Sequence, residues 1–248
     1  MDRPEPADIA ADLVPLPEVG RRFTTSRRVR LADADATGRL RLDAVARLLQ
    51  DVGNDDFADA GLDPGSPWVA RRTAVAVEAW PRLGERVQVT TWCGGLGSRW
   101  AERRSTLTGA AGGRVDVASL WVHLSDAGRP TRLPDWFLDT YGEAALGRVV
   151  SSRLSHPAVP VRATGRPWAV RATDLDVLGH VNNAATWAAV EDELWRRGAV
   201  PQRAELEYHA AIDPTDDVIL RVAEGSALGL WLTAGAATRA SARVAVGG

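Results

Sequence analysis

The stretch Asp174–Asn183, with the sequence DLDVLGHVNN, is the one around which this 248-residue chain is organised. Two carboxylates, a glycine, an imidazole and two carboxamides stand together there, just before an apolar helical pattern. No other stretch of the chain carries this density of reactive side chains. It is therefore the starting point for predicting both the fold and the function.

The same pattern occurs earlier in the chain. When residues 29–51 are placed under residues 170–192, a shift of 141 (170 − 29), both carboxylates and the glycine align. Solenoid repeats recur every 20 to 50 residues or so, and this much larger shift therefore indicates a duplicated domain. Arg39 stands where the later stretch has His180, so only the second copy has the histidine.

The first copy predicts a strand, a long helix and four further strands. Leu42, Val45, Leu49 and Val52 recur at helical spacing, so we expect a helix over residues 42–59. The antiparallel sheet that follows the long helix must cover it, because the apolar face of the helix has to be buried. We therefore expect the copy to be an α+β unit. Glycine-rich breaks separate the expected strands, which are residues 23–31, 68–80, 85–93, 98–108 and 114–124.

The second copy repeats this order in a shorter form. Val218 aligns with Val87 at a shift of only 131 (218 − 87), so the second copy lacks ten residues (141 − 131) between its helix and the turn before Val218. Its expected elements are a strand at Trp168–Ala172, a helix at Asn183–Arg197 and strands near 203–210, 217–223, 227–235 and 238–246.

These patterns divide the chain into four segments. We expect a proline-rich arm over residues 1–20, a first α+β unit over 21–125, a linker over 126–160 and a second α+β unit over 161–248. The linker is expected to cross the surface and to be partly helical at 135–145.

Composition excludes several classes of protein. A net charge of −2 gives no reason to expect binding to nucleic acid or to an anionic membrane. The single cysteine, Cys93, excludes an internal disulfide framework and a cysteine-based zinc site. The N-terminus does not resemble a signal peptide, and no apolar run approaches 18 residues. We therefore expect a cytoplasmic protein that does not insert into membranes.

From about residue 22 to residue 246 the chain resembles the acyl-acyl-carrier-protein (acyl-ACP) thioesterases. The stretch Asp174–Asn183 carries most of the resemblance. Shorter matches are Thr91-Trp92-Cys93, Leu48–Gly53, and the Trp121-Val122 strand that leads to Gly128-Arg129-Pro130. The resemblance implies two tandem hot-dog domains, each a long helix wrapped by an antiparallel sheet. It also implies that the N-terminal copy holds the acyl chain and that the C-terminal copy performs the chemistry.

Thioester hydrolysis needs a base or nucleophile, a placed water and a donor for the developing oxyanion. The resemblance makes Asp176 the candidate base or nucleophile, and His180 the residue that holds the water or donates to the carbonyl oxygen. The remaining expected substrate-binding residues are Gly179, Val181, Asn182 and Asn183. No metal or cofactor is expected.

The helix after this stretch begins near Asn183, so its free N–H groups and its positive dipole end point at the same place. One of these N–H groups could contact the oxyanion. Asn182 and Asn183 are also good N-cap residues. For Asn183 we favour the cap role over a catalytic role, and for Asn182 we favour neither.

The sequence departs from the family pattern at two catalytic positions. Leu178 stands where the family has an asparagine, and Ala211 or Ile212 stands where it has a glutamate. The motif also resembles single hot-dog acyl-CoA thioesterases. Glu191 could serve as a second carboxylate in such a scheme, although an exposed helix position is the favoured interpretation.

Other polar residues have simpler interpretations. Glu205, Glu207 and His209 alternate along one strand, which favours a solvated outer face over a reserve of acid–base groups. Asp35 of the first copy has Arg39 in place of the histidine, so we expect that site to be chemically silent.

We favour a hydrolase acting on acyl carrier protein or CoA thioesters. The alternatives are an acyl-binding or acyl-carrier-binding protein that has lost catalysis, and, with a poorer fit to the Asn-Asn ending, a hot-dog hydratase. Single hot-dog units pair by forming dimers, whereas the two units in this chain can pair with each other. We therefore expect either a monomer or a homodimer.

Overall fold

The structure, a computed structural model, describes residues 13–62 and 67–247. The first part of the expected arm, residues 1–12, and residues 63–66, where the sequence Asp-Pro-Gly-Ser is typical of a turn, lie outside the described residues. Within the described part, the predicted order of elements is present in both repeats.

The first repeat has the long helix with the bounds that its apolar spacing predicts. Its elements are β1 (Arg22–Arg28), the 3-10 helix η1 (Leu31–Asp33), α1 (Leu42–Asp59), β2 (Trp68–Ala79), β3 (Arg86–Leu96), β4 (Trp100–Gly109) and β5 (Arg114–His123). Two short helices, α2 (Asp135–Tyr141) and η2 (Glu143–Ala145), follow where partial helicity is predicted.

The second repeat has the same order with a shorter helix. Its elements are β6 (Thr164–Pro167), η3 (Ala172–Asp174), α3 (Asn183–Arg196), β7 (Pro201–Tyr208), β8 (Val218–Ala223), β9 (Leu228–Ala234) and β10 (Ala237–Val246). Helix α3 has 14 residues, against 18 in α1.

The prediction of a strand at Trp168–Ala172 is wrong. The strand β6 ends at Pro167, and residues 172–174 form a 3-10 turn instead. This turn is closed by Asp174, whose Oδ2 accepts the backbone N–H of Arg171 at 2.9 Å. Because a carboxylate that binds the backbone three residues earlier favours a turn over an extended strand, the chain leaves the sheet here. Asp33 binds the N–H of Arg30 at the same distance in the first repeat.

The ten strands form one antiparallel sheet in the order β1-β3-β4-β5-β2-β7-β10-β9-β8-β6. Read outward from the centre, the strand order of one repeat matches that of the other, so a pseudo-two-fold axis passes between β2 and β7. Ala74 pairs with Glu205 at this junction, at a shift of 131 (205 − 74). Each repeat is thus a long helix on an antiparallel sheet, and the two sheets are joined edge to edge.

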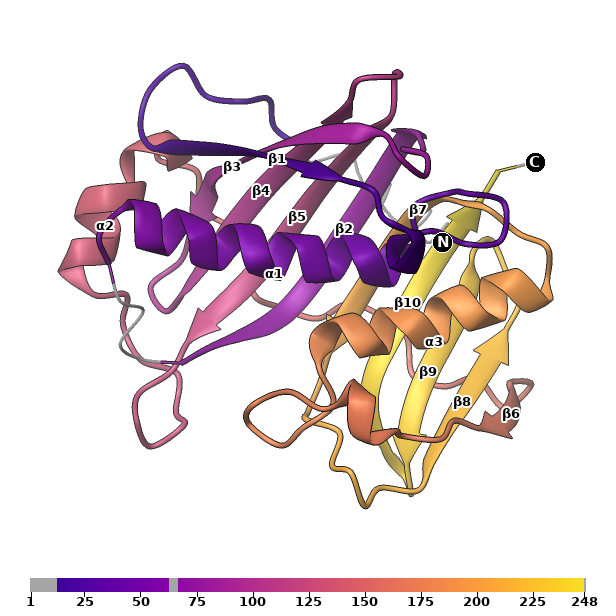
Figure 1. Ribbon diagram of the computed structural model, residues 1–248. Helices are drawn as coiled ribbons and strands as arrows, with labels where there is room; N and C mark the ends of the chain where they lie inside the picture. The colour runs from indigo at the N-terminus through magenta and orange to yellow at the C-terminus, as the bar shows by residue number, and fades with distance from the viewer. Residues whose placement is uncertain (1–12, 63–66, 248) are drawn as a thin grey trace, which may run out of the picture.

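Helices α1 and α3 lie side by side on one face of the sheet (Figure 1). Each presents an apolar stripe to its own half of the sheet, and one core cluster extends through both repeats. Fully burying an aliphatic side chain contributes about 1.5–3 kcal/mol. Helix packing in this cluster involves Leu42, Val45 and Val52 of α1 and Trp187, Val190 and Leu194 of α3.

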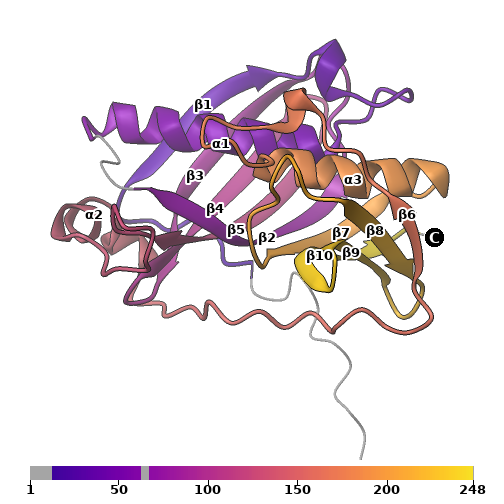
Figure 2. The ribbon, with the colours of Figure 1, turned by 90° about the horizontal axis from the view of Figure 1, so that it is seen from below.

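The linker after η2 runs along the face of the sheet opposite the helices (Figure 2). Trp231 of β9 donates from Nε1 to the carbonyl oxygen of Pro157 at 2.9 Å, which fixes the linker to the sheet. Among the described residues, none of the helices combines the length and the apolar character of a membrane span.

Candidate active site

The loop before α3 is built as a tight turn around Asp176. The backbone N–H of Asp176 donates to the carbonyl of His180 at 2.9 Å, and that of Gly179 donates to the carbonyl of Asp176 at 3.0 Å. Gly179 adopts φ = 79°, a left-handed conformation that costs glycine little. Oδ1 of Asp176 accepts the N–H groups of Leu178 at 2.9 Å and His180 at 3.3 Å. The turn therefore occupies one carboxylate oxygen, and Oδ2 forms no hydrogen bond with any described residue.

The loop leads directly into the N-terminus of α3. Asn182 is the N-cap, because its Oδ1 accepts the backbone N–H of Ala184 at 2.8 Å. The cap role favoured for Asn183 is therefore wrong: Asn183 is the first residue of the helix, one position too late to cap it. Its own N–H has no hydrogen-bond partner among the described residues, as expected for the first turn of a helix.

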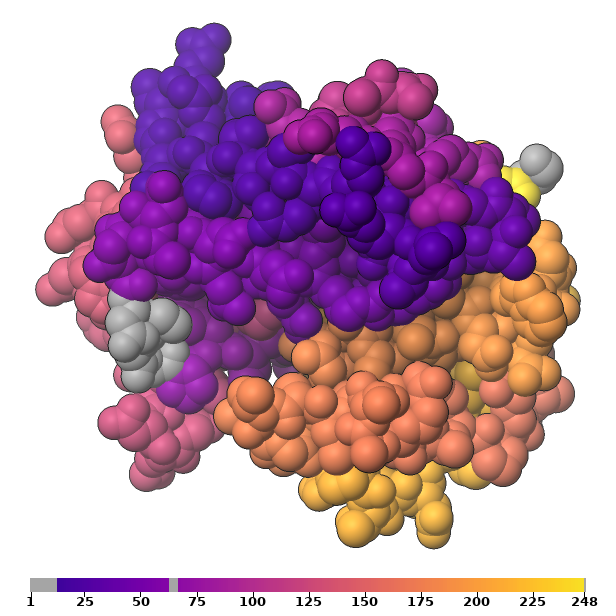
Figure 3. Space-filling model, viewed as in Figure 1, coloured from indigo at the N-terminus to yellow at the C-terminus, as the bar shows by residue number. Residues whose placement is uncertain are grey.

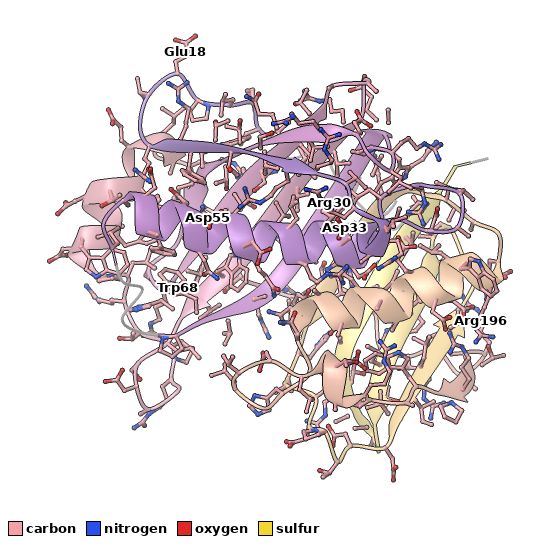
Figure 4. The ribbon with its side chains drawn as sticks, viewed as in Figure 1. Glu18, Arg30, Asp33, Asp55, Trp68 and Arg196 are labelled. Carbon is pink, nitrogen blue, oxygen red and sulfur yellow. The ribbon has the colours of Figure 1, made fainter. Side chains whose placement is uncertain are left out.

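A cavity of about 460 Å³ lies between α1, the sheet and this loop. Such a volume is within the usual range of small-molecule sites. The surface is hollowed between α1 and the C-terminal repeat (Figure 3), and Figure 4 shows Trp68 at the start of β2, below the C-terminal half of α1. Three predicted site residues line the cavity: Asp176, Asn182 and Asn183. Its aromatic wall consists of Phe57, Trp68, Trp92, Trp121, Phe137 and Tyr141.

The second repeat has a much smaller void beside its helix. This void under α3 measures about 10 Å³ and is lined mainly by aliphatic side chains. The loop from α3 to β7 covers residues 197–200, whereas the loop from α1 to β2 covers residues 60–67. The second repeat therefore has both a shorter helix and a shorter exit loop than the first.

The other predicted site residues lie near the cavity without lining it. The His180 imidazole is half-buried and forms no hydrogen bond with a described residue. Gly179 is exposed in the turn. Val181 is buried, and its N–H donates to the carbonyl of Ile212 at 3.0 Å, which anchors the loop to the segment after β7.

The two departures from the family pattern have different surroundings. Leu178 is 65% exposed at the tip of the loop. Ala211 is also exposed, whereas Ile212 is buried in the core. Neither position brings a polar side chain to the cavity.

Sequence reasoning missed the polar residues that α1 contributes to the cavity. These are Gln50, Asp51 and Asn54, all on the first repeat. The shift of 141 contained a signal for one of them, because position 50 aligns with Glu191 (191 − 141). The alignment becomes informative only when it is known that the helix of one repeat lies beside the motif loop of the other.

The equivalent site in the first repeat is filled by ion pairs. Arg39, at the position of His180, donates from Nε to Oδ2 of Asp35 at 2.9 Å. It also donates from Nη1 and Nη2 to the two carboxylate oxygens of Glu191, at 3.1 and 2.7 Å. Oε1 of Glu191 accepts the N–H of Leu42, the first residue of α1, at 2.7 Å. The interpretation of Glu191 as an exposed residue is wrong, because α1 and α3 pack together and bury it to 6% exposure.

These contacts explain the directions in which the pKa values of Asp35 and Arg39 are shifted. Burial alone would raise the pKa of Asp35, but hydrogen bonds from Thr37 and Arg39 and the positive charge of Arg39 lower it. Burial opposes the charge on Arg39, and the carboxylates of Glu191 and Asp35 outweigh it, so the pKa of Arg39 is raised. Asp35 and Arg39, the counterparts of Asp176 and His180, thus both have charged partners.

The far wall of the cavity is partly polar. Arg103 of β4 donates from Nη1 to Asp56 at 2.6 Å, and its guanidinium lies 5.8 Å from the ring centroid of Phe57. Cys93 is also in this wall, and burial raises the pKa of its thiol to about 11. The thiol is therefore neutral at physiological pH and a poor nucleophile.

The interpretation of Glu205, Glu207 and His209 as a solvated face is wrong for the two glutamates. The linker covers them: Glu207 is fully buried and accepts the N–H groups of Ser155 at 2.6 Å and His156 at 3.1 Å. Nε2 of the His156 imidazole contacts Glu205 at 3.0 Å.

The donor atoms of His156, Glu205 and Glu207 lie within 4.8 Å of one another, a spacing that could hold a metal ion. However, the two imidazole nitrogens point to different partners, because Nδ1 contacts Ser241 at 2.9 Å and Nε2 contacts Glu205. Glu207 is already engaged by backbone N–H groups. These contacts favour a structural role for the cluster, in which it attaches the linker to the sheet, over a metal centre.

Comparisons with known proteins identify the family and the fold. Residues 20–141 match the family model of the acyl-ACP thioesterase N-terminal domain. An uncharacterised protein of Mycobacterium tuberculosis is 33% identical over 218 residues, covering 86% of this chain and 87% of that protein.

Two solved structures share the whole fold. The 12:0-ACP thioesterase of Umbellularia californica is 22% identical with a TM-score of 0.76, covering 91% of this chain and 97% of that one. An acyl-ACP thioesterase of Bacteroides thetaiotaomicron is 17% identical with a TM-score of 0.75, covering 91% and 98%. The predicted α+β fold with two tandem hot-dog domains is confirmed. The chain therefore belongs to the acyl-ACP thioesterase family.

Proposed function

We propose that the protein hydrolyses fatty acyl thioesters, with acyl-ACP as the favoured substrate and acyl-CoA as the alternative, and releases the free fatty acid. The acyl chain occupies the aromatic-walled cavity of the N-terminal repeat, and the thioester lies at the loop before α3. The observation that carries the proposal is the contrast between the two repeats. Asp176 and Asn183 keep unpartnered groups at a cavity, whereas their counterparts Asp35 and Leu42 are engaged by Arg39 and Glu191.

In this proposal Asp176 acts as the general base. Its Oδ1 is held by the turn, so Oδ2 is fixed in direction and free to accept a proton from water. His180 stands at the position of Arg39, which in the first repeat contacts the free oxygen of the equivalent aspartate. An imidazole placed in this way can orient the attacking water against Asp176.

The water oxygen bonds to the thioester carbon as Asp176 takes the proton, and negative charge develops on the carbonyl oxygen. The N–H of Asn183 at the start of α3 stabilises that charge, helped by the positive end of the helix dipole. Collapse of the tetrahedral intermediate breaks the C–S bond. The thiolate then takes the proton from Asp176, which restores the carboxylate.

The test is thiol release from a panel of acyl-ACP and acyl-CoA substrates of increasing chain length. The Asp176→Asn variant keeps the turn, since its side-chain oxygen can still accept the loop N–H groups, but it loses the base. We expect kcat to fall by about 10²–10⁴-fold. Asp35→Asn is the matched control, because it makes the same change at the equivalent position of the silent loop.

The control variant should retain kcat and lose stability, whereas Asp176→Asn should lose kcat and keep its unfolding temperature. Equal turnover by wild type and Asp176→Asn would contradict the role of Asp176. Absence of turnover on every substrate would contradict hydrolysis itself and favour an acyl-binding protein. The ratio of kcat/KM values on the two carriers decides between acyl-ACP and acyl-CoA.

A further inference from the structure

The duplication relates the silent loop to the proposed active site residue by residue. With the shift of 141, Asp35 corresponds to Asp176 and Leu42 to Asn183 (42 + 141). The two loops also share their backbone hydrogen bonds: Asp35 N–H to the carbonyl of residue 39 measures 2.8 Å, and Asp176 N–H to that of residue 180 measures 2.9 Å. A contact in one loop therefore indicates where its counterpart lies in the other.

In the silent loop an anionic oxygen already sits at the helix N-terminus. Oε1 of Glu191 is 2.7 Å from the backbone nitrogen of Leu42. The side chain reaches this position from α3, the helix of the other repeat, and is almost fully buried there. A charged oxygen at this distance from a helix N-terminal N–H has the geometry that an oxyanion site requires. Glu191 thus marks, within the same chain, where an oxyanion would bind.

At the proposed active site the counterpart of Glu191 is Gln50 (191 − 141). Gln50 is on α1, is partly exposed, and lines the cavity together with Asp176 and Asn183. Its carboxamide forms no hydrogen bond with any described residue. Glutamine has the shape of glutamate, but its nitrogen donates two hydrogen bonds and it carries no charge. A glutamine at this position therefore leaves the oxyanion site open and adds a donor to it.

We propose that Gln50 is a catalytic residue of the C-terminal site, supplied by the N-terminal repeat. Its Nε2 donates to the carbonyl oxygen of the thioester, which also accepts the N–H of Asn183. This inference rests on the proposed hydrolysis. Two donors on one oxygen stabilise the tetrahedral intermediate more than the ground-state carbonyl, because the negative charge exists only after water has added. Gln50 thereby brings a polar side chain to a site in which Leu178 and Ala211 replace the polar residues of the family pattern.

The experiment compares Gln50→Ala and Gln50→Glu in steady-state thiol release, with Gln88→Ala and Gln88→Glu as matched controls. Gln88 is exposed on β3, away from the cavity. Removing one oxyanion donor typically lowers kcat by about 10²–10³-fold, and we expect a loss of this size in Gln50→Ala with little change in KM. Gln50→Glu should be less active still, because its carboxylate would take the N–H of Asn183 as Glu191 takes that of Leu42.

This order of activities separates catalysis from a structural role. If Gln50 only packed or solvated the cavity wall, the similar shape of glutamate would make Gln50→Glu the milder change. Wild-type kcat in Gln50→Ala, or a Gln50→Glu variant more active than Gln50→Ala, would overturn the assignment of Gln50 and leave the proposed hydrolysis standing. Absence of turnover in the wild type would overturn both.

A second readout does not depend on activity. The double variant Gln50→Glu/His180→Arg recreates at the C-terminal loop the residues that form the Glu191–Arg39 pair. We expect its unfolding temperature to exceed that of either single variant, because the carboxylate and the guanidinium stabilise each other, whereas each single variant has only one of the two charges. A double variant no more stable than the singles would show that Gln50 does not face this loop, and would overturn the inference.

Discussion

Arg39 and Glu191, 152 residues apart in the sequence, form a buried two-point ion pair that joins the two repeats. Their side chains are only 6% and 7% exposed, and the Arg39 guanidinium lies 4.9 Å from the ring centroid of Trp80. The pair occupies the site that is equivalent to the proposed catalytic loop. In the first repeat this site therefore holds a contact between the repeats.

Removing one member of this pair should be strongly destabilising. Glu191→Ala leaves a guanidinium buried without its main partner and leaves the N–H of Leu42 unpaired. Breaking a buried ion pair in this way typically costs about 3–5 kcal/mol, which urea unfolding of the purified variant can measure. The control is Arg39→Met/Glu191→Met, which removes both charges and should cost less than Glu191→Ala. A loss smaller than that of the double variant would show that the pair contributes little.

Filling the cavity from α1 should shorten the preferred acyl chain. Gly53 lines the cavity, and a Cβ added there would meet only Nε of Arg103, at 3.9 Å, which is an ordinary contact. Gly53→Ala should therefore be tolerated. Gly53→Leu should displace the end of a long acyl chain, and each methylene pushed out of the cavity costs about 0.8 kcal/mol of binding.

The measurement for Gly53→Leu is kcat/KM across a series of saturated acyl chains, with Gly53→Ala as the control. The expected result is a selective loss on long chains. An equal loss on all chain lengths would mean that the acyl chain does not extend along α1.

Cys93 should be unreactive in the folded protein and dispensable for turnover. Burial raises the pKa of its thiol to about 11, against roughly 8.5 for a free cysteine. Alkylation by iodoacetamide at pH 8 should therefore be slow in the native protein and fast after unfolding in urea, as mass spectrometry can follow. Cys93→Ala should keep kcat. Rapid native alkylation together with loss of kcat in the variant would instead indicate a reactive cysteine.

Glu85 should make stability depend on pH in the acidic range. Burial alone would raise its pKa, but the backbone N–H groups of Arg82, Ala111 and Gly113 hold the carboxylate and lower it. A carboxyl whose pKa is lower in the folded state binds more protons when unfolded. Its stabilising contribution is therefore complete above the unfolded value, about 4.3, and is lost as the pH falls through the lower folded value.

Unfolding temperatures of wild type and Glu85→Gln between pH 7 and pH 3 test this expectation. The variant should be less stable at pH 7, and the difference should shrink as the pH falls. A difference that stays constant over this range would mean that the charge of Glu85 does not contribute.

Several features followed from the sequence alone. The apolar spacing of Leu42, Val45, Leu49 and Val52 was sufficient for the bounds of α1, because an 18-residue amphipathic helix repeats its signal many times. The shift of 141 indicated the duplication, and the motif at Asp174–Asn183 indicated the family, because local chemistry is written directly in adjacent residues.

Contacts between segments distant in the sequence required the tertiary structure. Glu191 resembles an exposed helix residue until α1 packs beside α3, and Glu207 resembles a solvated strand residue until the linker covers it. That Gln50 and Asp176 line one cavity likewise depends on how the two repeats join between β2 and β7. A sequence pattern indicates which face of its own helix or strand a residue occupies. Which other segment packs against that face is determined only when the two repeats join their sheets.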